Sequence, residues 1–174
     1  MANSVDILIA CAGFVVFFLY ASLFEYAFHR WVMHRRWRVL PSPYETHTLL
    51  HHEVFYGDES FQGRRTQDRD RILFEWWQGP FIIGAHAPAI WGLQLLTGLP
   101  LFGGGIVAMA VYYVLYEYLH FSIHRPAGRW IERTRAFRYL AARHRHHHRL
   151  WRTNFNVVFP LGDLAFGTFR PVTF

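Results

Sequence analysis

Lysine is absent from this chain of 174 residues, so all eighteen basic residues are arginine. Cysteine occurs once, as Cys11 inside an apolar run, which excludes an intrachain disulfide and a thiolate metal site. The net charge is +6. Because the arginines alternate with apolar runs of membrane length, anionic lipid headgroups are the expected neighbours and nucleic acid is not an expected partner. The N-terminal apolar run lacks a basic start and a small-residue cleavage site, so we expect a retained helix rather than a signal peptide.

Hydrophobic residues make up 52% of the chain and are concentrated in blocks. A helix needs about 20 apolar residues to cross a bilayer, because every backbone group must find its hydrogen-bond partner within the helix. Three runs meet this length, at about residues 5–28, 72–97 and 102–120. We therefore predict a single all-α integral-membrane domain over residues 1–174, with a turn at Gly98-Leu99-Pro100 and with kinks at Gly79, Pro80 and Pro88.

The distribution of arginine predicts the orientation. No arginine occurs in residues 1–29 or 72–124, and all of them lie in residues 30–71 and 125–170. Under the positive-inside rule these two segments are cytosolic, whereas the N-terminus and the turn after residue 97 lie on the opposite side. Three crossings satisfy this multi-pass arrangement. A soluble helical protein with an apolar core is the alternative, and it would leave the segregation of arginine unexplained.

The polar segments are expected to form a cytosolic cap. Residues 30–71 contain Pro41, Pro43 and Gly57 and are predicted to be part helix and part loop. Residues 128–149 combine arginine with aromatic side chains, which is typical of a helix that lies along the headgroup layer. The tail at 153–174 is predicted to be irregular.

Histidine is the outlier of the composition, with twelve residues. Ten of them form four clusters, each at the predicted cytosolic end of an apolar run or in a cytosolic segment. Imidazole is the commonest metal-ligating side chain and suits iron, zinc and copper, and ten nitrogens are too many for one ion. We therefore predict a site for two metal ions whose ligands are His29, His34, His47, His51, His52, His120, His124, His144, His147 and His148.

The spacing within each cluster limits which metal each histidine reaches. His120 and His124 are four residues apart and share a helix face. The cluster at 144–148 spans an arc of about 100°, so it serves one centre or bridges two, and the cluster at 47–52 does much the same with one ligand swung outward. His29 and His34 are about 140° apart on an ideal helix, so they serve different metals or the helix loosens between them.

Two histidines and several other polar residues lie outside this ligand set. His146 faces away from its neighbours and is expected to meet solvent or headgroups. His86 lies inside the second apolar run, where an ionisable residue is functional by default, although its role stays open. Carboxylates near the clusters are candidates for the outer shell that orients metal-bound histidines. The outer-shell candidates are Glu25, Glu117 and Asn154, together with Glu53, for which a solvated charge is an equal alternative.

The order of the histidine motifs resembles that of the fatty acid hydroxylase and sterol desaturase superfamily. The motifs read H-R-W-V-M-H, H-T-L-L-H-H, H-F-S-I-H and H-R-H-H-H, and the closing segment from Asn154-Phe155-Asn156 through Pro160-Leu161-Gly162-Asp163 to Phe166-Gly167-Thr168 is also similar. The resemblance covers about Glu25 to Thr168, nearly the whole chain.

This resemblance implies a membrane hydroxylase that acts on a fatty acid, sphingolipid or sterol-type lipid. It implies two metal ions, normally iron, and dioxygen as co-substrate, with one oxygen atom entering the lipid and the other leaving as water. A separate donor, such as a reductase with ferredoxin or cytochrome, would supply two electrons. The ten clustered histidines become metal ligands, and no catalytic residue is expected apart from the metal centre. Zinc is an alternative in isolated protein, because its affinity usually exceeds that of ferrous iron.

Two other functions stay open at this point. A carotenoid hydroxylase is favoured by the short chain, the short connector after the first motif and the similarity of that motif. Three features argue against it: the second motif has one extra residue, the third has three intervening residues, and the closing segment looks like the fatty acid and sterol branch. We therefore favour the fatty acid and sterol branch. A membrane metal-binding or transport protein would need ionisable ligands near the bilayer midplane, where only His86 qualifies.

Overall fold

The computed structural model describes residues 4–63 and 71–174, and no strand occurs in that part of the chain. The all-helical prediction is therefore confirmed for these residues. Residues 64–70 of the predicted polar connector lie outside the described part. The chain divides into two compact units, the first made of Met1–Ala21 and Phe74–Leu115 and the second of Ser22–Leu73 and Tyr116–Phe174.

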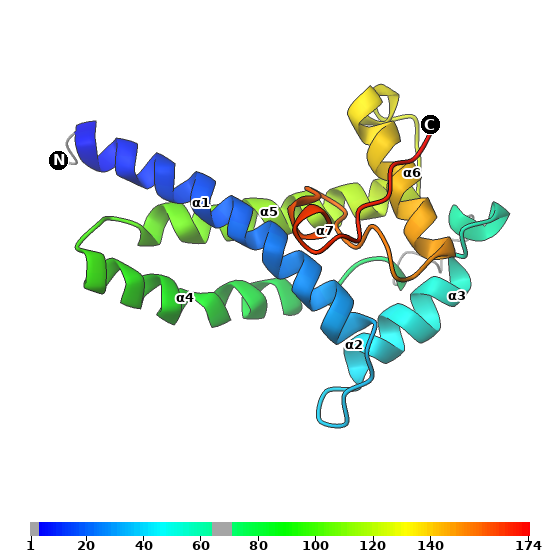
Figure 1. Cartoon of the computed structure of the whole chain (residues 1–174), viewed down its shortest axis with the longest axis horizontal. Helices are drawn as coiled ribbons and strands as arrows, with labels where there is room; N and C mark the ends of the chain where they lie inside the picture. The colour runs from blue at the N-terminus through cyan, green and yellow to red at the C-terminus, as the bar shows by residue number, and fades with distance from the viewer. Residues whose placement is uncertain (1–3, 64–70) are drawn as a thin grey trace. The chain divides into compact units, whose positions relative to one another are not determined.

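The first unit contains the beginning of α1 (Ser4–Phe28), all of α4 (Gln78–Thr97) and the beginning of α5 (Phe102–His124). Figure 1 shows α4 and α5 joined by a tight connection, as predicted. Gly98 ends α4 in the left-handed region at φ 68°, which a residue without a Cβ adopts at little cost, and its N–H donates to Gln94 O at 2.8 Å. Gln94 Oε1 then accepts from the N–H of Phe102 at 2.9 Å, which ties the start of α5 to α4.

Among the described residues, two stretches are long and apolar enough to cross a membrane, Ser4–Met33 and Phe102–His124. The second predicted run, at about residues 72–97, differs from expectation, because α4 begins at Gln78 and not near Ile72. Pro80 lies in the first turn of α4, where its missing N–H would have no helical partner, so it marks the start of a helix instead of a kink. A membrane crossing by α4 stays a prediction.

Small residues let α1 and α5 approach closely within the first unit. A Cβ built on Gly104 would lie 2.3 Å from the carbonyl oxygen of Ala10 on α1. A Cβ on Gly105 would lie 2.9 Å from Ile90 Cγ2 on α4. Glycine at these two positions therefore removes the side chain that would hold the helices apart, a common device in membrane helix pairs.

Gly104→Ala is expected to destabilise the protein by about 1–3 kcal/mol, because the added methyl group must push α1 away from α5. Gly103 provides a matched control, since a Cβ there would meet nothing within 4 Å. Gly103→Ala is expected to be neutral or to stabilise by up to about 1 kcal/mol through helix propensity. Thermal unfolding of both variants in the same detergent measures the difference, and equal midpoints would contradict the close approach.

The second unit contains the C-terminal ends of α1 and α5 and a set of short helices. These are the π-helices η1 (His29–Met33) and η2 (Glu45–His51), the α-helices α2 (Ser42–Tyr44), α3 (His52–Val54), α6 (Arg135–Arg149) and α7 (Leu161–Ala165), and the 3₁₀ helices η3 (Glu59–Phe61) and η5 (Trp130–Arg133). The helix predicted at 128–149 is thus a 3₁₀ turn followed by α6. Thr134 caps α6 by accepting the N–H of Phe137 at 3.2 Å. The tail is irregular as predicted, except for α7.

Candidate metal centre

Ten histidine side chains of the second unit meet in two adjacent groups of five. In each group, one ring nitrogen from every residue lies within 4.8 Å of those of the others. Nine of the ten side chains are buried and His34 is half-buried. The structure therefore brings together all ten histidines singled out in the sequence. The first group is His29, His34, His47, His52 and His147, and the second group is His51, His120, His124, His144 and His148.

Two π-helical turns decide how the first two motifs are divided. The N–H of His34 donates to His29 O at 3.1 Å, and the N–H of His52 donates to His47 O, so both bonds join residues five apart. This wider turn brings residues five apart onto one face, whereas an α-helix would rotate them by about 140°. His29 and His34 therefore stack at 5.0 Å between ring centroids and share one group. Of the two alternatives left open for this pair, the loosened helix is the one observed.

The second motif and the fourth motif each contribute to both groups. His51 leaves His47 and His52 and joins the second group, so it is the ligand swung outward. On α6, His144 and His148 are four residues apart and enter the second group, while His147 enters the first. The groups touch where the rings of His52 and His148 stack at 4.1 Å between centroids. The histidines of α6 therefore bridge two centres.

The spacing of the Nε2 atoms matches that of ligands around a metal ion. A metal–nitrogen bond of about 2.0–2.1 Å and a right angle between ligands place neighbouring nitrogens about 2.9 Å apart. Five Nε2 pairs lie close to this distance. They are His29–His47 at 2.8 Å, His34–His147 at 3.1 Å, His47–His52 at 3.1 Å, His124–His144 at 3.0 Å and His144–His148 at 3.1 Å.

Hydrogen bonds on the other ring nitrogen fix which nitrogen faces the centre. A backbone carbonyl can only accept, so an Nδ1 that contacts one must carry the ring proton, and the Nε2 of a neutral imidazole then presents a lone pair. Five rings are held in this way. The acceptors are Phe155 O for His29 at 2.5 Å, Arg71 O for His51 at 2.8 Å, Phe61 O for His124 at 2.9 Å, Thr153 O for His147 at 2.8 Å and Phe55 O for His148.

With these tautomers, the Nε2 lone pairs in the groups outnumber the N–H donors that could bond to them. In the second group, Nε2 of His144 faces the unprotonated Nε2 atoms of both His124 and His148, and it can donate to only one of them. Nε2 of His51 and Nε2 of His120 are buried and have no hydrogen-bond partner in the described part of the chain. A cation at the middle of the group would satisfy all of these nitrogens at once. The donor set therefore fits a metal ion in each group.

Burial also keeps the histidines outside the apolar spans neutral. Loss of hydration lowers the pKa of His51 to about 4, and it outweighs the hydrogen bond to the Arg71 carbonyl, which acts in the opposite direction. Loss of hydration followed by repulsion from neighbouring histidines lowers the pKa of His144 and His52 well below the usual value. Neutral imidazole is the form that binds metal. The site is therefore in its binding form at neutral pH without having to release protons.

A buried ion pair holds the segment that supports the first group. Arg143 Nη2 donates to Asp163 Oδ2 at 2.7 Å, and both side chains are almost fully buried. The Asp163 carboxylate also accepts the N–H groups of Phe155 and Asn156, at 2.8 and 2.9 Å. Since Phe155 O receives the ring proton of His29, this carboxylate fixes the backbone that orients a histidine of the first group. Sequence reasoning did not single out Asp163 or Arg143. The signal available was a carboxylate inside the closing motif.

The outer-shell candidates have different surroundings. Glu25 accepts from the N–H of Val157 at 2.5 Å and from Asn156 Nδ2 at 3.0 Å, so it anchors the closing segment. Glu117 is half-buried in α5, and Glu53 is exposed, as a solvated charge would be. Asn154 is fully buried, with φ 54°, and its Oδ1 accepts the N–H of Arg170 at 2.8 Å. The ring protons of His29, His51, His124, His147 and His148 instead go to backbone carbonyls.

The two remaining histidines lie outside both groups. Nδ1 of His146 is 3.3 Å from Thr153 Oγ1 and 3.3 Å from Asn154 Nδ2, so this half-buried ring also has protein neighbours. A solvent or headgroup contact of the exposed part of the ring stays a prediction. His86 bonds through Nδ1 to Ile82 O, one turn earlier on α4, at 2.7 Å, and its ring meets Tyr20 edge-on at 5.6 Å. In the described residues, His86 therefore hydrogen-bonds to the backbone of its own helix and packs on α1 within the first unit.

The fold and the site together define a helical protein with apolar helices of membrane length and a polyhistidine site able to hold metal. The family model for fatty acid hydroxylase matches residues 14–168, nearly the whole chain. The chain therefore belongs to the fatty acid hydroxylase family, which confirms the resemblance of the histidine motifs. This membership supports a hydroxylase type of oxidoreductase associated with a membrane. No curated protein and no solved structure matches the chain at the significance used in these comparisons.

Proposed function

We propose that this chain is a membrane-embedded lipid hydroxylase with two metal ions, normally iron, one in each histidine group. When bound, the metal pair would activate dioxygen so that one oxygen atom enters a C–H bond of the lipid and the other leaves as water. A separate donor protein, a reductase with a ferredoxin or a cytochrome, would supply the two electrons. The observation that carries the proposal is the pair of adjacent five-histidine groups with Nε2 spacings of a coordination shell, in a chain of this family.

The surrounding residues would prepare the site for this chemistry. The backbone carbonyls of Phe55, Phe61 and Phe155 hold ring protons away from the centre, so that the Nε2 lone pairs point inward. The burial of the rings would exclude bulk water from the metal ions that they hold. With ten neutral nitrogens and no carboxylate in either group, the positive charge of the metals would stay largely uncompensated.

Isotope labelling tests the reaction. Purified protein is loaded with ferrous iron, embedded in lipid, and supplied with ¹⁸O₂ and an electron donor. Hydroxylation predicts one ¹⁸O atom in a lipid product, whereas desaturation predicts a new double bond without ¹⁸O. The mass and position of the product also distinguish fatty acid, sphingolipid and sterol from the carotenoid alternative. Metal flux into liposomes without consumption of oxygen would overturn the proposal in favour of a transport protein.

The proposed topology has three crossings, with the histidines on the cytosolic side and the N-terminus opposite. Its support is the distribution of arginine and the two helices of spanning length. In a Cys11→Ser background, Leu99→Cys in the turn is expected to react with a membrane-impermeant maleimide on intact cells. Ser60→Cys in the second unit should react only after permeabilisation, and both side chains are exposed. Labelling of both from the same side would contradict a crossing by α4.

A further inference from the structure

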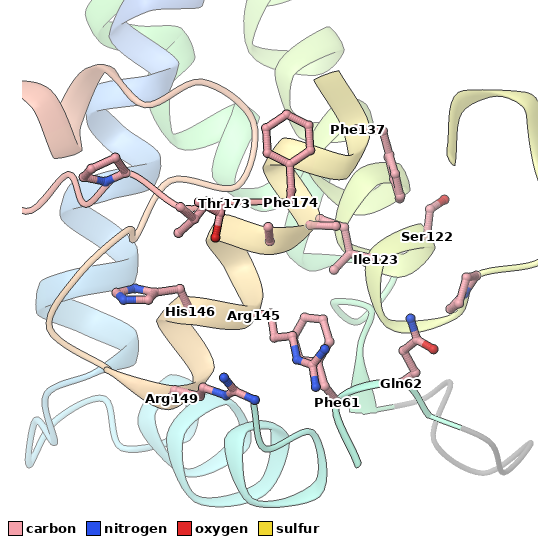
Figure 2. Close-up of a pocket in the computed structure, with 15 residues that line it drawn as sticks. Phe61, Gln62, Ser122, Ile123, Phe137, Arg145, His146, Arg149, Thr173 and Phe174 are labelled. Atoms are coloured by element: carbon pink, nitrogen blue, oxygen red, sulfur yellow. The ribbon is translucent and has the colours of Figure 1, made fainter. Parts of the chain in front are cut away.

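The second unit contains a cavity of about 670 Å³ whose described lining includes no member of either histidine group. Its wall comes from η3, α5, α6 and the C-terminal residues of the chain (Figure 2). On α5 it is lined by Ser122 and Ile123, which lie between the ligand candidates His120 and His124. On α6 it is lined by Arg145 and Arg149, which alternate with the histidines. The cavity therefore lies against the opposite faces of the helices that present the metal site.

Most of the wall is apolar. Phe61, Ile123 and Phe137 are buried, and Phe174 closes the cavity from the C-terminal end. Ala141 and Ala142 face the same space, and their short side chains leave it open. A volume of this size falls in the range of small-ligand pockets, about 300–1,000 Å³. The wall is suited to a hydrocarbon chain.

The polar part of the wall has one sign of charge. Arg145 and Arg149 are exposed, and neither has a carboxylate within ion-pairing distance among the described residues. Backbone carbonyls hold them in place, since Nε of each donates to Gly57 O and Nη2 of Arg145 donates to Asp58 O at 2.9 Å. The described lining contains no Asp or Glu. Two guanidinium groups are thus fixed at the cavity, and the charge of Arg149 also helps to lower the pKa of Asp58, whose carboxylate lies outside the described lining.

We propose that this cavity binds an amphiphile with an anionic head, in which a carboxylate or phosphate lies against Arg145 and Arg149 and an alkyl chain lies along the apolar wall. Guanidinium groups match both anions because they offer parallel N–H donors. A neutral lipid would offer the two guanidinium groups no anionic partner in the cavity, and an inorganic anion would leave the apolar wall in contact with water. The same head-group chemistry is offered by a free fatty acid and by an anionic phospholipid.

Phe61 connects this cavity to the second histidine group. Its ring lies 4.7 Å from that of His124 and 5.3 Å from that of His148, measured between centroids, and its carbonyl accepts the ring proton of His124. The Arg145 guanidinium lies 5.9 Å from the centre of the same ring (Figure 2). An occupant would therefore restrain Phe61 and α6 and stabilise the histidines behind them. The site is separate from the reaction proposed above and does not depend on it.

The test uses the full chain in nanodiscs of zwitterionic lipid and three probes, decyl phosphate, decanoate and decanol. The two anionic probes are expected to bind and to raise the unfolding midpoint, whereas decanol and inorganic phosphate should do neither. The double variant Arg145→Gln/Arg149→Gln should bind the anionic probes at least about tenfold more weakly, because charge-assisted contacts are lost. The matched control Arg135→Gln/Arg138→Gln removes the same charge from exposed positions of α6 outside the cavity and should bind as wild type does.

Ala142→Phe provides a second variant that keeps both arginines and their contacts with Gly57. The added ring should fill the cavity and abolish binding of decanoate while the protein still folds. The proposal would be overturned if the cavity variants and the control bound the anionic probes equally. It would also be overturned if decanol stabilised the protein as much as the anionic probes do, or if inorganic phosphate bound as tightly as decyl phosphate. Nanodiscs of phosphatidylglycerol distinguish the two sources. If the bilayer supplies the occupant, phosphatidylglycerol discs should stabilise the protein and weaken its binding of decanoate. If a free fatty acid is the occupant, the protein should bind decanoate equally well in both kinds of disc.

Discussion

Replacing His144 or His120 by alanine is expected to remove about one of the two metal ions per chain and to abolish lipid oxidation. Both side chains are buried in the second histidine group. Nε2 of His144 contacts two other Nε2 atoms, so its loss would open two edges of the coordination shell. His47→Ala should instead empty the first group, where its Nε2 has the same bridging place between His29 and His52. Metal content per chain and product formation measure both effects.

His146→Ala is the matched control, since it removes an imidazole from the same helix. Its ring contacts Thr153 and Asn154 and belongs to neither group. The variant should keep both metal ions and most of its activity. An equal loss of metal in the variants of His120, His144 and His146 would refute the division into ligands and non-ligands. If the single substitution His144→Ala removed both ions, the two groups would bind metal cooperatively.

Asp163→Asn is expected to lower the free energy of unfolding by about 3–5 kcal/mol, because it leaves the buried guanidinium of Arg143 without its counter-charge. The substitution keeps the shape of the side chain but removes the negative charge that holds Arg143 and the N–H groups of Phe155 and Asn156. Since Phe155 O positions the ring of His29, metal affinity of the first group should also fall by about 10–100-fold. Asp163 thus acts as a positioning residue.

Denaturant titration in detergent and metal competition measure these two effects separately. Glu45→Gln provides the control for removal of an ion pair, since Glu45 and Arg36 are 3.5 Å apart and largely exposed. That substitution should cost about 0–1 kcal/mol and leave metal binding unchanged. If Asp163→Asn lost stability but bound metal in the first group as wild type does, the link through Phe155 would be wrong. If it cost no more than Glu45→Gln, the buried pair would not be a determinant of stability.

The helical class and the positions of α1 and α5 could be predicted because they depend on local composition. Runs of apolar side chains have few alternatives to a helix of membrane length, so the predicted start and end of α1 agree closely with the structure. The start of α4 could not be predicted in the same way. Residues before Gln78 are also apolar and aromatic, and hydropathy does not distinguish a helix from the segment that leads into it. Pro80 was interpreted as a kink inside a helix, whereas proline is also tolerated in the first turn and here lies just after the helix start.

The outer shell around the histidines was the least predictable part of the site. Carboxylates next to the motifs were the natural candidates, since such groups often orient metal-bound imidazoles. Here five of the rings donate to backbone carbonyls, several of them distant in sequence, such as Phe155 for His29 and Phe55 for His148. Every residue has a carbonyl, so no residue type in the sequence marks the one that is used. Asp163 acts one step further away, through the backbone.

The sequence alone singled out the ten histidines that meet in the structure, because they fall in four clusters that can be recognised without knowledge of packing. It also predicted that two metal ions would use them, which stays a prediction. The tertiary structure decided which five histidines form each group. That division depends on two π-helical turns, which bring residues five apart into line, and on the packing of α6, which directs His147 to one group and His144 and His148 to the other. A pattern based on 3.6 residues per turn contains neither the local widening of a helix nor the direction from which a distant helix approaches.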